Sequence, residues 1–214
     1  MTILAIGILA SLLQVAGYAF YSSKMLKRDI RPNAASWLMF AYGTTLLAIL
    51  EWDRGASFAL LVLPILCAIS STLVAMYALR HTASWWPQHP LERFSICLDI
   101  TLTIVYASTW ILLANNFIVE SQKDLADLLI LICWNIGTFT AFFPLLRQVY
   151  HHPKSEHAAP WIVWASAYFL LLIATVAESG IRSELILFPL VNTFVHAFIA
   201  FRVRQRLRAE ADNI

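Results

Sequence analysis

The residues of this sequence best suited to binding chemistry are isolated polar side chains inside long apolar runs. Four of them lie about ten residues from the same end of their runs, which at ~1.5 Å per residue is near the middle of a ~30 Å hydrocarbon layer: Ser11, Cys67, Asn135 and Asn192. Polar groups at that depth are costly and are therefore candidates for a functional site. They can hydrogen-bond a polar solute, or join neighbouring helices through contacts worth about 0.6 kcal/mol each. We expect a polar ring that binds a solute, with the two asparagines as its main hydrogen-bonding members.

Four more side chains extend this predicted ring. Gln14 and His196 lie about one turn deeper, and His196 shares a helix face with Asn192 at the i, i+4 spacing. A histidine inside a membrane can bind a proton or can simply pack against its neighbours. Tyr42 and Tyr168 lie at mid-depth, where their rings can form walls of a pocket and stack on a cyclic solute.

Asp99 is the one acidic residue that the hydropathy pattern places well inside an apolar run. A proton-coupled carrier needs such a carboxylate to take up and release a proton. Asp99 can instead reach the nearby membrane surface or pair with Arg93 or Arg80, and the sequence leaves both explanations open.

These residues must be positioned by membrane-spanning helices. The chain is 60% hydrophobic and only 13% charged, and one span needs ~20 mostly apolar residues. The first apolar run is expected to be retained, because no basic segment precedes it as in a signal peptide. The pattern predicts an all-α integral membrane protein with seven transmembrane helices, at about residues 2–22, 34–51, 57–79, 94–115, 126–149, 158–177 and 184–202.

Lysine and arginine are divided unequally between the two sides of the predicted bundle. With the N-terminus outside, twelve basic residues fall on inner segments and only Arg54, Lys123 and Arg182 fall on outer ones. Basic residues favour the cytoplasmic side. We therefore expect a multi-pass protein of the inner (plasma) membrane, with the N-terminus outside and the C-terminus in the cytoplasm. The tail 205–214 then serves as a basic anchor at anionic lipid and not as a nucleic-acid site.

The sequence repeats itself at a spacing of 124 residues. Seven identities occur in sixteen gapless positions when residues 34–49 are aligned with residues 158–173. Two parallel halves with a cavity between them are typical of alternating-access transporters. We predict two parallel three-helix repeats joined by a linker helix, in the order 1–80 (first repeat), 81–120 (linker helix and flanking loops) and 121–204 (second repeat).

Three prolines are candidate hinges. Pro64 and Pro189 are partners in the repeat and both are predicted inside helices, and Pro144 interrupts the fifth run. Proline removes a backbone donor and bends a helix. We expect these positions to serve helices that move.

The layout of three, one and three helices resembles the SWEET and PQ-loop group of transporters. The segments that carry the match are Phe143-Pro144-Leu145, Lys154-Ser155 and Trp161, together with Asn33-Ala-Ala-Ser-Trp37 in the first half. The resemblance implies a solute transporter with a pocket asparagine in the third helix of each half. Asn192 fits that place, and Cys67 takes the partner position. Leu145 stands where the group has glutamine, which weakens the specific inference of a sugar.

Other functions find little support in the sequence. No Walker loop, nucleophile elbow or metal-ligand cluster is present, so we expect neither enzymatic activity nor a cofactor. His151, His152 and His157 lack an acidic partner at ligand spacing, which argues against a metal site. A retinal protein requires a lysine inside its last helix, and this sequence has none there. A net charge of +2 and short loops offer no surface for a nucleic acid.

We therefore expect a facilitative, alternating-access transporter of a small polar, mostly uncharged solute such as a sugar. One alternative is a vitamin or nucleoside carrier that resembles the nicotinamide riboside transporters, because Trp161-x-x-Trp164 echoes their Trp-rich helix. Another is a non-transporting membrane receptor or partner subunit on the same fold. The expected partners are the solute and the lipid bilayer, and the sequence leaves open whether copies associate into a homo-oligomer.

Overall fold

A computed structural model describes residues 2–81, 86, 89–181 and 184–211. Over these residues the fold is all-helical, and seven helical segments are long and apolar enough to cross a membrane. The helices are α1 (Ile3–Leu26), α2 (Ala34–Asp53), α3 (Phe58–Arg80), α4 (Pro90–Ala114), α5 (Glu120–Ala141), α6 (Phe143–His151), η1 (Pro153–Ser155), α7 (Ala158–Ser179), η2 (Glu184–Ile186) and α8 (Leu187–Ala211). The predicted all-α protein with seven candidate spans is confirmed. Arg182 and residues 212–214 of the predicted basic tail lie outside the described residues.

The fifth span differs most from its predicted range of 126–149. It runs from Glu120 to His151 as α5 followed by α6. The polar stretch 120–124 lies outside the predicted range, but it forms the first turns of α5. The extension is possible because Lys123 is paired with carboxylates inside the bundle, as described below, so its charge is neutralised there. Pro144 lies in the first turn of α6, directly after the break between the two helices.

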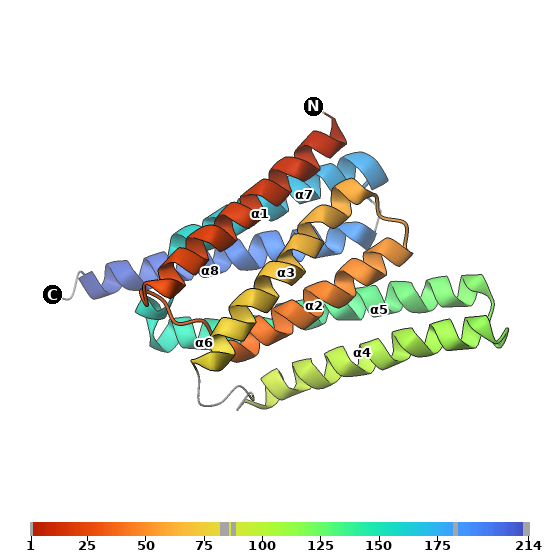
Figure 1. Cartoon of the computed structure of the whole chain (residues 1–214), viewed down its shortest axis with the longest axis horizontal. Helices are drawn as coiled ribbons and strands as arrows, with labels where there is room; N and C mark the ends of the chain where they lie inside the picture. Colours follow the sequence, from red (N-terminus) through yellow and green to blue (C-terminus); the bar gives the residue numbers. More distant parts are fainter. Residues whose placement is uncertain (1, 82–85, 87–88, 182–183, 212–214) are drawn as a thin grey trace.

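Six of the spans form a closed ring around a central axis. In one group α3 contacts both α1 and α2, and in the other α8 contacts both α5 and α7. The groups meet along two lines of contact, which we name the α1–α7 seam and the α2–α5 seam. Contact is more extensive at the α1–α7 seam. Helix α4 lies outside the ring against α5, with a smaller contact to α2 (Figure 1).

A glycine allows the close approach of helices at the α1–α7 seam. An added Cβ at Gly17 would lie 2.4 Å from Nε1 of Trp164, far inside van der Waals contact. The same indole nitrogen donates a hydrogen bond of 3.2 Å to the carbonyl oxygen of Gln14. The large indole of α7 therefore packs directly on the backbone of α1, and only glycine fits beneath it.

The outward surface of the bundle is apolar. Large side chains such as Leu12, Leu73 and Phe194 are 61%, 63% and 66% exposed, respectively. Such residues gather on the surface of a soluble protein only at interfaces, whereas lipid tails cover them readily. Together with the seven candidate spans, this surface indicates a multi-pass membrane protein.

The two ends of the bundle differ in charge. One end, here the acidic end, carries the N-terminus and the α2–α3, α4–α5 and α7–α8 connections, and the other, the basic end, carries the C-terminus (Figure 1). Among the described residues, the acidic end holds seven carboxylates and two cations: Glu51, Asp53, Glu120, Asp124, Asp127, Glu178 and Glu184, with Arg54 and Lys123. Among the residues whose side chains the structure describes, the basic end holds ten cations: Lys24, Lys27, Arg28, Arg31, Arg80, Arg93, Arg147, Lys154, Arg202 and Arg204.

Candidate functional site

A cavity lies within the ring, and all seven spans contribute side chains to its walls. The volume of the cavity that the centres of water molecules can occupy is about 30 Å³. This is enough for a water or two and too little for a metabolite. A metabolite would fit here only if the surrounding helices moved apart, so the cavity is closed in this structure.

The walls of this cavity are mainly aromatic. Four tryptophans line it, and each is no more than 2% exposed: Trp37, Trp134, Trp161 and Trp164. The ring centroids of Trp161 and Trp164 lie 5.0 Å apart and those of Phe40 and Phe142 lie 4.4 Å apart. Rings at such separations pack favourably with one another and offer flat faces to a planar or cationic group.

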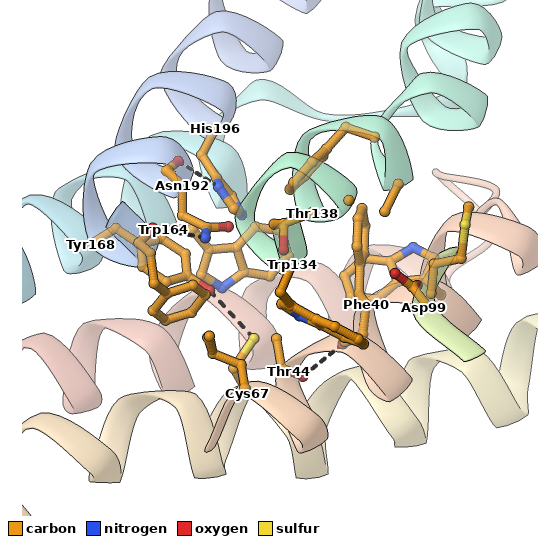
Figure 2. Close-up of a pocket in the computed structure, with 18 of the residues that line it drawn as sticks. Phe40, Thr44, Cys67, Asp99, Trp134, Thr138, Trp164, Tyr168, Asn192 and His196 are labelled. Atoms are coloured by element: carbon orange, nitrogen blue, oxygen red, sulfur yellow. Dashed lines mark hydrogen bonds between the residues drawn. The ribbon is translucent and has the colours of Figure 1, made fainter. Parts of the chain in front are cut away.

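A polar cluster occupies one side of the cavity (Figure 2). Nδ1 of His196 lies 2.7 Å from the carbonyl oxygen of Asn192, so it must donate that hydrogen bond. In the neutral ring Nε2 is then an acceptor. The hydroxyl of Tyr168 lies 3.4 Å from Sγ of Cys67, and its ring packs 4.9 Å from the His196 ring. The structure therefore brings together four residues of the predicted ring, from α3, α7 and α8.

Asp99 of α4 lies at the opposite side of the cavity in Figure 2, beyond Trp134 and Thr138. The sequence left open an escape to the membrane surface, but its side chain faces the cavity between α2 and α5 and is 5% exposed. Within the described residues Asp99 forms no ion pair, so it is not paired with Arg93 or Arg80. Its Oδ1 would lie 3.1 Å from a Cβ added at Gly137, so this glycine lets the carboxylate enter the wall.

The remaining members of the predicted ring do not line the cavity. Ser11 and Asn135 donate hydrogen bonds to carbonyl groups of their own helices, at 2.8 Å in each case. Gln14 lies behind the wall, where its Nε2 lies 3.4 Å from the Tyr168 hydroxyl. Tyr42 faces α4, is 41% exposed and bonds to the hydroxyl of Thr103. Depth alone cannot distinguish these positions from Asn192, because the helix face also matters.

The candidate hinge prolines occupy unlike positions. Pro64 lies inside α3, as predicted. Pro189 lies in the first turn of α8, directly after η2, where a missing N–H breaks no α-helical hydrogen bond. Pro144 holds a similar place at the start of α6. Pro189 is thus inside α8, but in its first turn and not in its interior, so the repeat partners Pro64 and Pro189 differ locally.

The basic end of the cavity is closed by a hydrogen-bonded group, the Glu156 cluster: Glu156, Tyr21, Trp37 and Trp161. The Tyr21 hydroxyl donates to one carboxylate oxygen of Glu156 at 2.9 Å, and Nε1 of Trp161 donates to the other at 3.1 Å. Nε1 of Trp37 donates to the Tyr21 hydroxyl at 3.2 Å. Burial raises the pKa of the Glu156 carboxyl to about 8, although both hydrogen bonds act in the opposite direction.

Backbone contacts reinforce this closure across the two groups of helices. The Arg31 amide donates to the carbonyl of Ser155 at 2.9 Å, and Nε2 of Gln148 donates to the carbonyl of Arg31 at 2.6 Å. Nδ2 of Asn33 donates to Oε1 of Gln148 at 3.1 Å. The connection between α1 and α2 is thereby held against the segment between α5 and α7.

Ion pairs close the acidic end, and we call this set the acidic-end clamp: Asp53, Arg54, Lys123, Asp127 and Glu184. Nζ of Lys123 lies 2.6 Å from the carboxylates of both Asp53 and Asp127, and the lysine is 2% exposed. Nε of Arg54 donates to Glu184 at 2.7 Å. Asp53 and Arg54 end the second helix, whereas their partners belong to α5 and η2, so the clamp also joins the two groups of helices.

Sequence reasoning missed four buried acids, because it treated Asp99 as the only one. Glu51, Glu92, Asp127 and Glu156 are 4%, 5%, 1% and 3% exposed. The first three are close to the ends of their spans, and Glu156 lies in a connection, so hydropathy assigned all four to membrane surfaces. A tryptophan five residues after Glu156 was the one local signal that it could be held inside.

Comparison with known proteins adds no assignment: no protein-family model, no curated protein and no solved structure matches this chain. Over the described residues, no group of three or more His, Cys, Asp or Glu side chains is placed to hold a metal ion. The site must therefore be interpreted from its own geometry.

Proposed function

We propose that this protein is an alternating-access carrier of a small solute, which binds in the central cavity. One observation carries the proposal: a cavity walled by all seven spans is closed at both ends by contacts between the same two groups of helices. Breaking the Glu156 cluster would open the cavity to the basic end, and breaking the acidic-end clamp would open it to the other. A carrier needs two such closures that open in turn.

The order of helix contacts supports two related halves. In each group the third span packs between the other two, as α3 does between α1 and α2 and α8 does between α5 and α7. This order agrees with the sequence repeat that relates residues 1–80 to 121–204. We propose that the halves are parallel repeats, with α4 as their linker, and that the basic end faces the cytoplasm.

Cys67 offers a test of access, because it lines the cavity and is 4% exposed. The other two cysteines, Cys97 and Cys133, are replaced by alanine, which leaves Cys67 as the one thiol. The variant is reconstituted in oriented vesicles and treated with a membrane-impermeant methanethiosulfonate reagent on one side or the other. A carrier predicts labelling from both sides.

The clamp gives a matched control for this experiment. Replacing Arg54 by glutamine removes the pair with Glu184 and is expected to speed labelling from the acidic end several-fold, with labelling from the basic end unchanged or slower. Labelling from one side only would indicate the receptor alternative. Labelling from neither side, with no uptake of labelled sugars, nucleosides or vitamins by the same vesicles, would refute the carrier proposal.

A further inference from the structure

We infer that the cavity selects a small organic cation of the quaternary ammonium type, held between the Asp99 carboxylate and the rings of Trp134 and Phe40. The inference rests on the proposed function and specifies its solute. It competes with the mostly uncharged, sugar-like solute that the sequence led us to expect.

The first support is the isolation of the Asp99 carboxylate. It is 5% exposed, lies in the cavity wall and forms no ion pair within the described residues. A buried charge without a partner is strongly destabilising. By contrast, the buried Lys123 has two carboxylate partners. The Asp99 carboxyl therefore needs either a proton or a bound cation, and the described residues around it supply no cation.

The second support is the aromatic surface around this carboxylate. Trp134, Phe40 and Phe142 line the same cavity, and the described lining residues include no lysine or arginine. A cation over the face of a tryptophan is attracted by the ring, most strongly in a site without water. Quaternary ammonium ions suit such a site because they carry charge without hydrogen-bond donors that would need partners.

The third support is a shortage of hydrogen-bond donors for hydroxyl oxygens. The Thr44 hydroxyl donates to the carbonyl of Phe40 at 2.6 Å, and Nδ2 of Asn192 donates to the carbonyl of Phe188 at 2.9 Å. The Thr44 hydrogen and one N–H of the Asn192 amide are thus engaged within their own helices. A sugar with many hydroxyls that lost its water here would find few donors for its oxygens, which costs binding energy.

The fourth support is the charge of the entrance. Seven described carboxylates and two cations lie at the acidic end, whereas the basic end is rich in lysine and arginine. Clefts lined by one sign of charge concentrate ions of the opposite sign. A cationic solute would thus approach through the acidic end and meet Asp99 within the cavity.

Choline and 3,3-dimethylbutan-1-ol provide a matched pair of probes, because they share a shape and differ in charge. Binding is measured by calorimetry on the purified protein and by protection of Cys67 from the methanethiosulfonate reagent. We expect choline to bind at least about tenfold more tightly than the alcohol. Asp99→Asn should abolish this preference, whereas Asp29→Asn, which removes a carboxylate paired with Lys24 at the surface, should preserve it.

The outcomes separate this inference from the carrier proposal. If Cys67 is labelled from both sides but choline binds no better than the alcohol, the solute is not an organic cation and the carrier proposal stands. If choline is preferred equally by the wild type and by Asp99→Asn, the carboxylate is not the selecting group. Because the preference is first measured in the wild-type protein, poor folding of the variant cannot hide the answer.

Discussion

The Glu156 cluster leads to a quantitative prediction about pH. Its carboxyl is 3% exposed and has a pKa raised from 4.5 to about 8 by burial. If opening the basic end brings this group to water, its pKa returns to the ordinary value. The difference corresponds to about 5 kcal/mol, which is the extra cost of closing the cluster around a charged carboxylate.

The sign follows from the raised pKa. Below about pH 4.5 the carboxyl is neutral in both conformations, so the closed cluster keeps its full stability. Between that value and about 8, closing takes up one proton, and the ratio of closed to open protein falls about tenfold per pH unit. Raising the pH therefore opens the basic end. The hydroxyl of Tyr21 donates directly to this carboxyl. The titratable ring of His196 lies on the other side of Trp161, and the centroids of these two rings are 5.4 Å apart.

Glu156→Gln keeps the shape of the neutral acid and removes the titration. The rate of Cys67 labelling from the basic end is measured between about pH 5.5 and 7.5, with Cys67 as the one thiol. Thiol reactivity itself rises with pH, so the informative quantity at each pH is the labelling rate of this protein divided by that of the same protein carrying Glu156→Gln. We expect this ratio to rise about tenfold per pH unit until the open form predominates.

A flat ratio would refute the coupling of this carboxyl to opening. Asp29→Asn serves as the control, because its side chain is 46% exposed at the same end of the bundle. If the rise of the labelling-rate ratio with pH also disappeared in Asp29→Asn, general surface charge and not Glu156 would be its cause.

Three further predictions follow from packing, pairing and binding. Gly17→Ala should lower the free energy of unfolding by about 1–3 kcal/mol, because the added Cβ would overlap Trp164. Gly43→Ala should be tolerated, because its Cβ meets its nearest neighbour at 3.6 Å. Thermal unfolding in detergent tests both variants. Lys123→Met should destabilise the protein by roughly 3–5 kcal/mol, since two carboxylates 2.6 Å away lose their partner, and double variants that also neutralise a carboxylate should recover part of the loss. Asn192→Ala should weaken solute binding measured by calorimetry, and unchanged affinity would remove this residue from the site.

The sequence was sufficient to predict the seven spans, because the apolar runs alone determine them. It also located Asn192, His196 and Cys67 at the right depth for the cavity. It could not separate Tyr168, in the wall, from Tyr42, which faces α4, because these helices are apolar on every side and show no preferred face.

Tertiary partners explain what sequence reasoning missed. Glu156 bonds to Tyr21, 135 residues away in sequence, and Lys123 bonds to Asp53, 70 residues away. Each polar group is tolerated inside the bundle only because of that distant partner. Hydropathy assigns a residue by its neighbours along the chain and therefore sends both to the membrane surface.

The unequal seams have a mechanical consequence. The indole of Trp164 rests on the backbone of α1 at Gly17, so this line of contact has little freedom to separate. The α2–α5 seam is less extensive and is covered from outside by α4. We expect the α1–α7 seam to act as a pivot at Gly17 and the opposite seam to widen, in an asymmetric motion that separates Tyr21 from Glu156 at the basic end of the pivot seam. Asp99 would then travel with α5, and the hydrogen bond between Tyr42 of α2 and Thr103 of α4 would break.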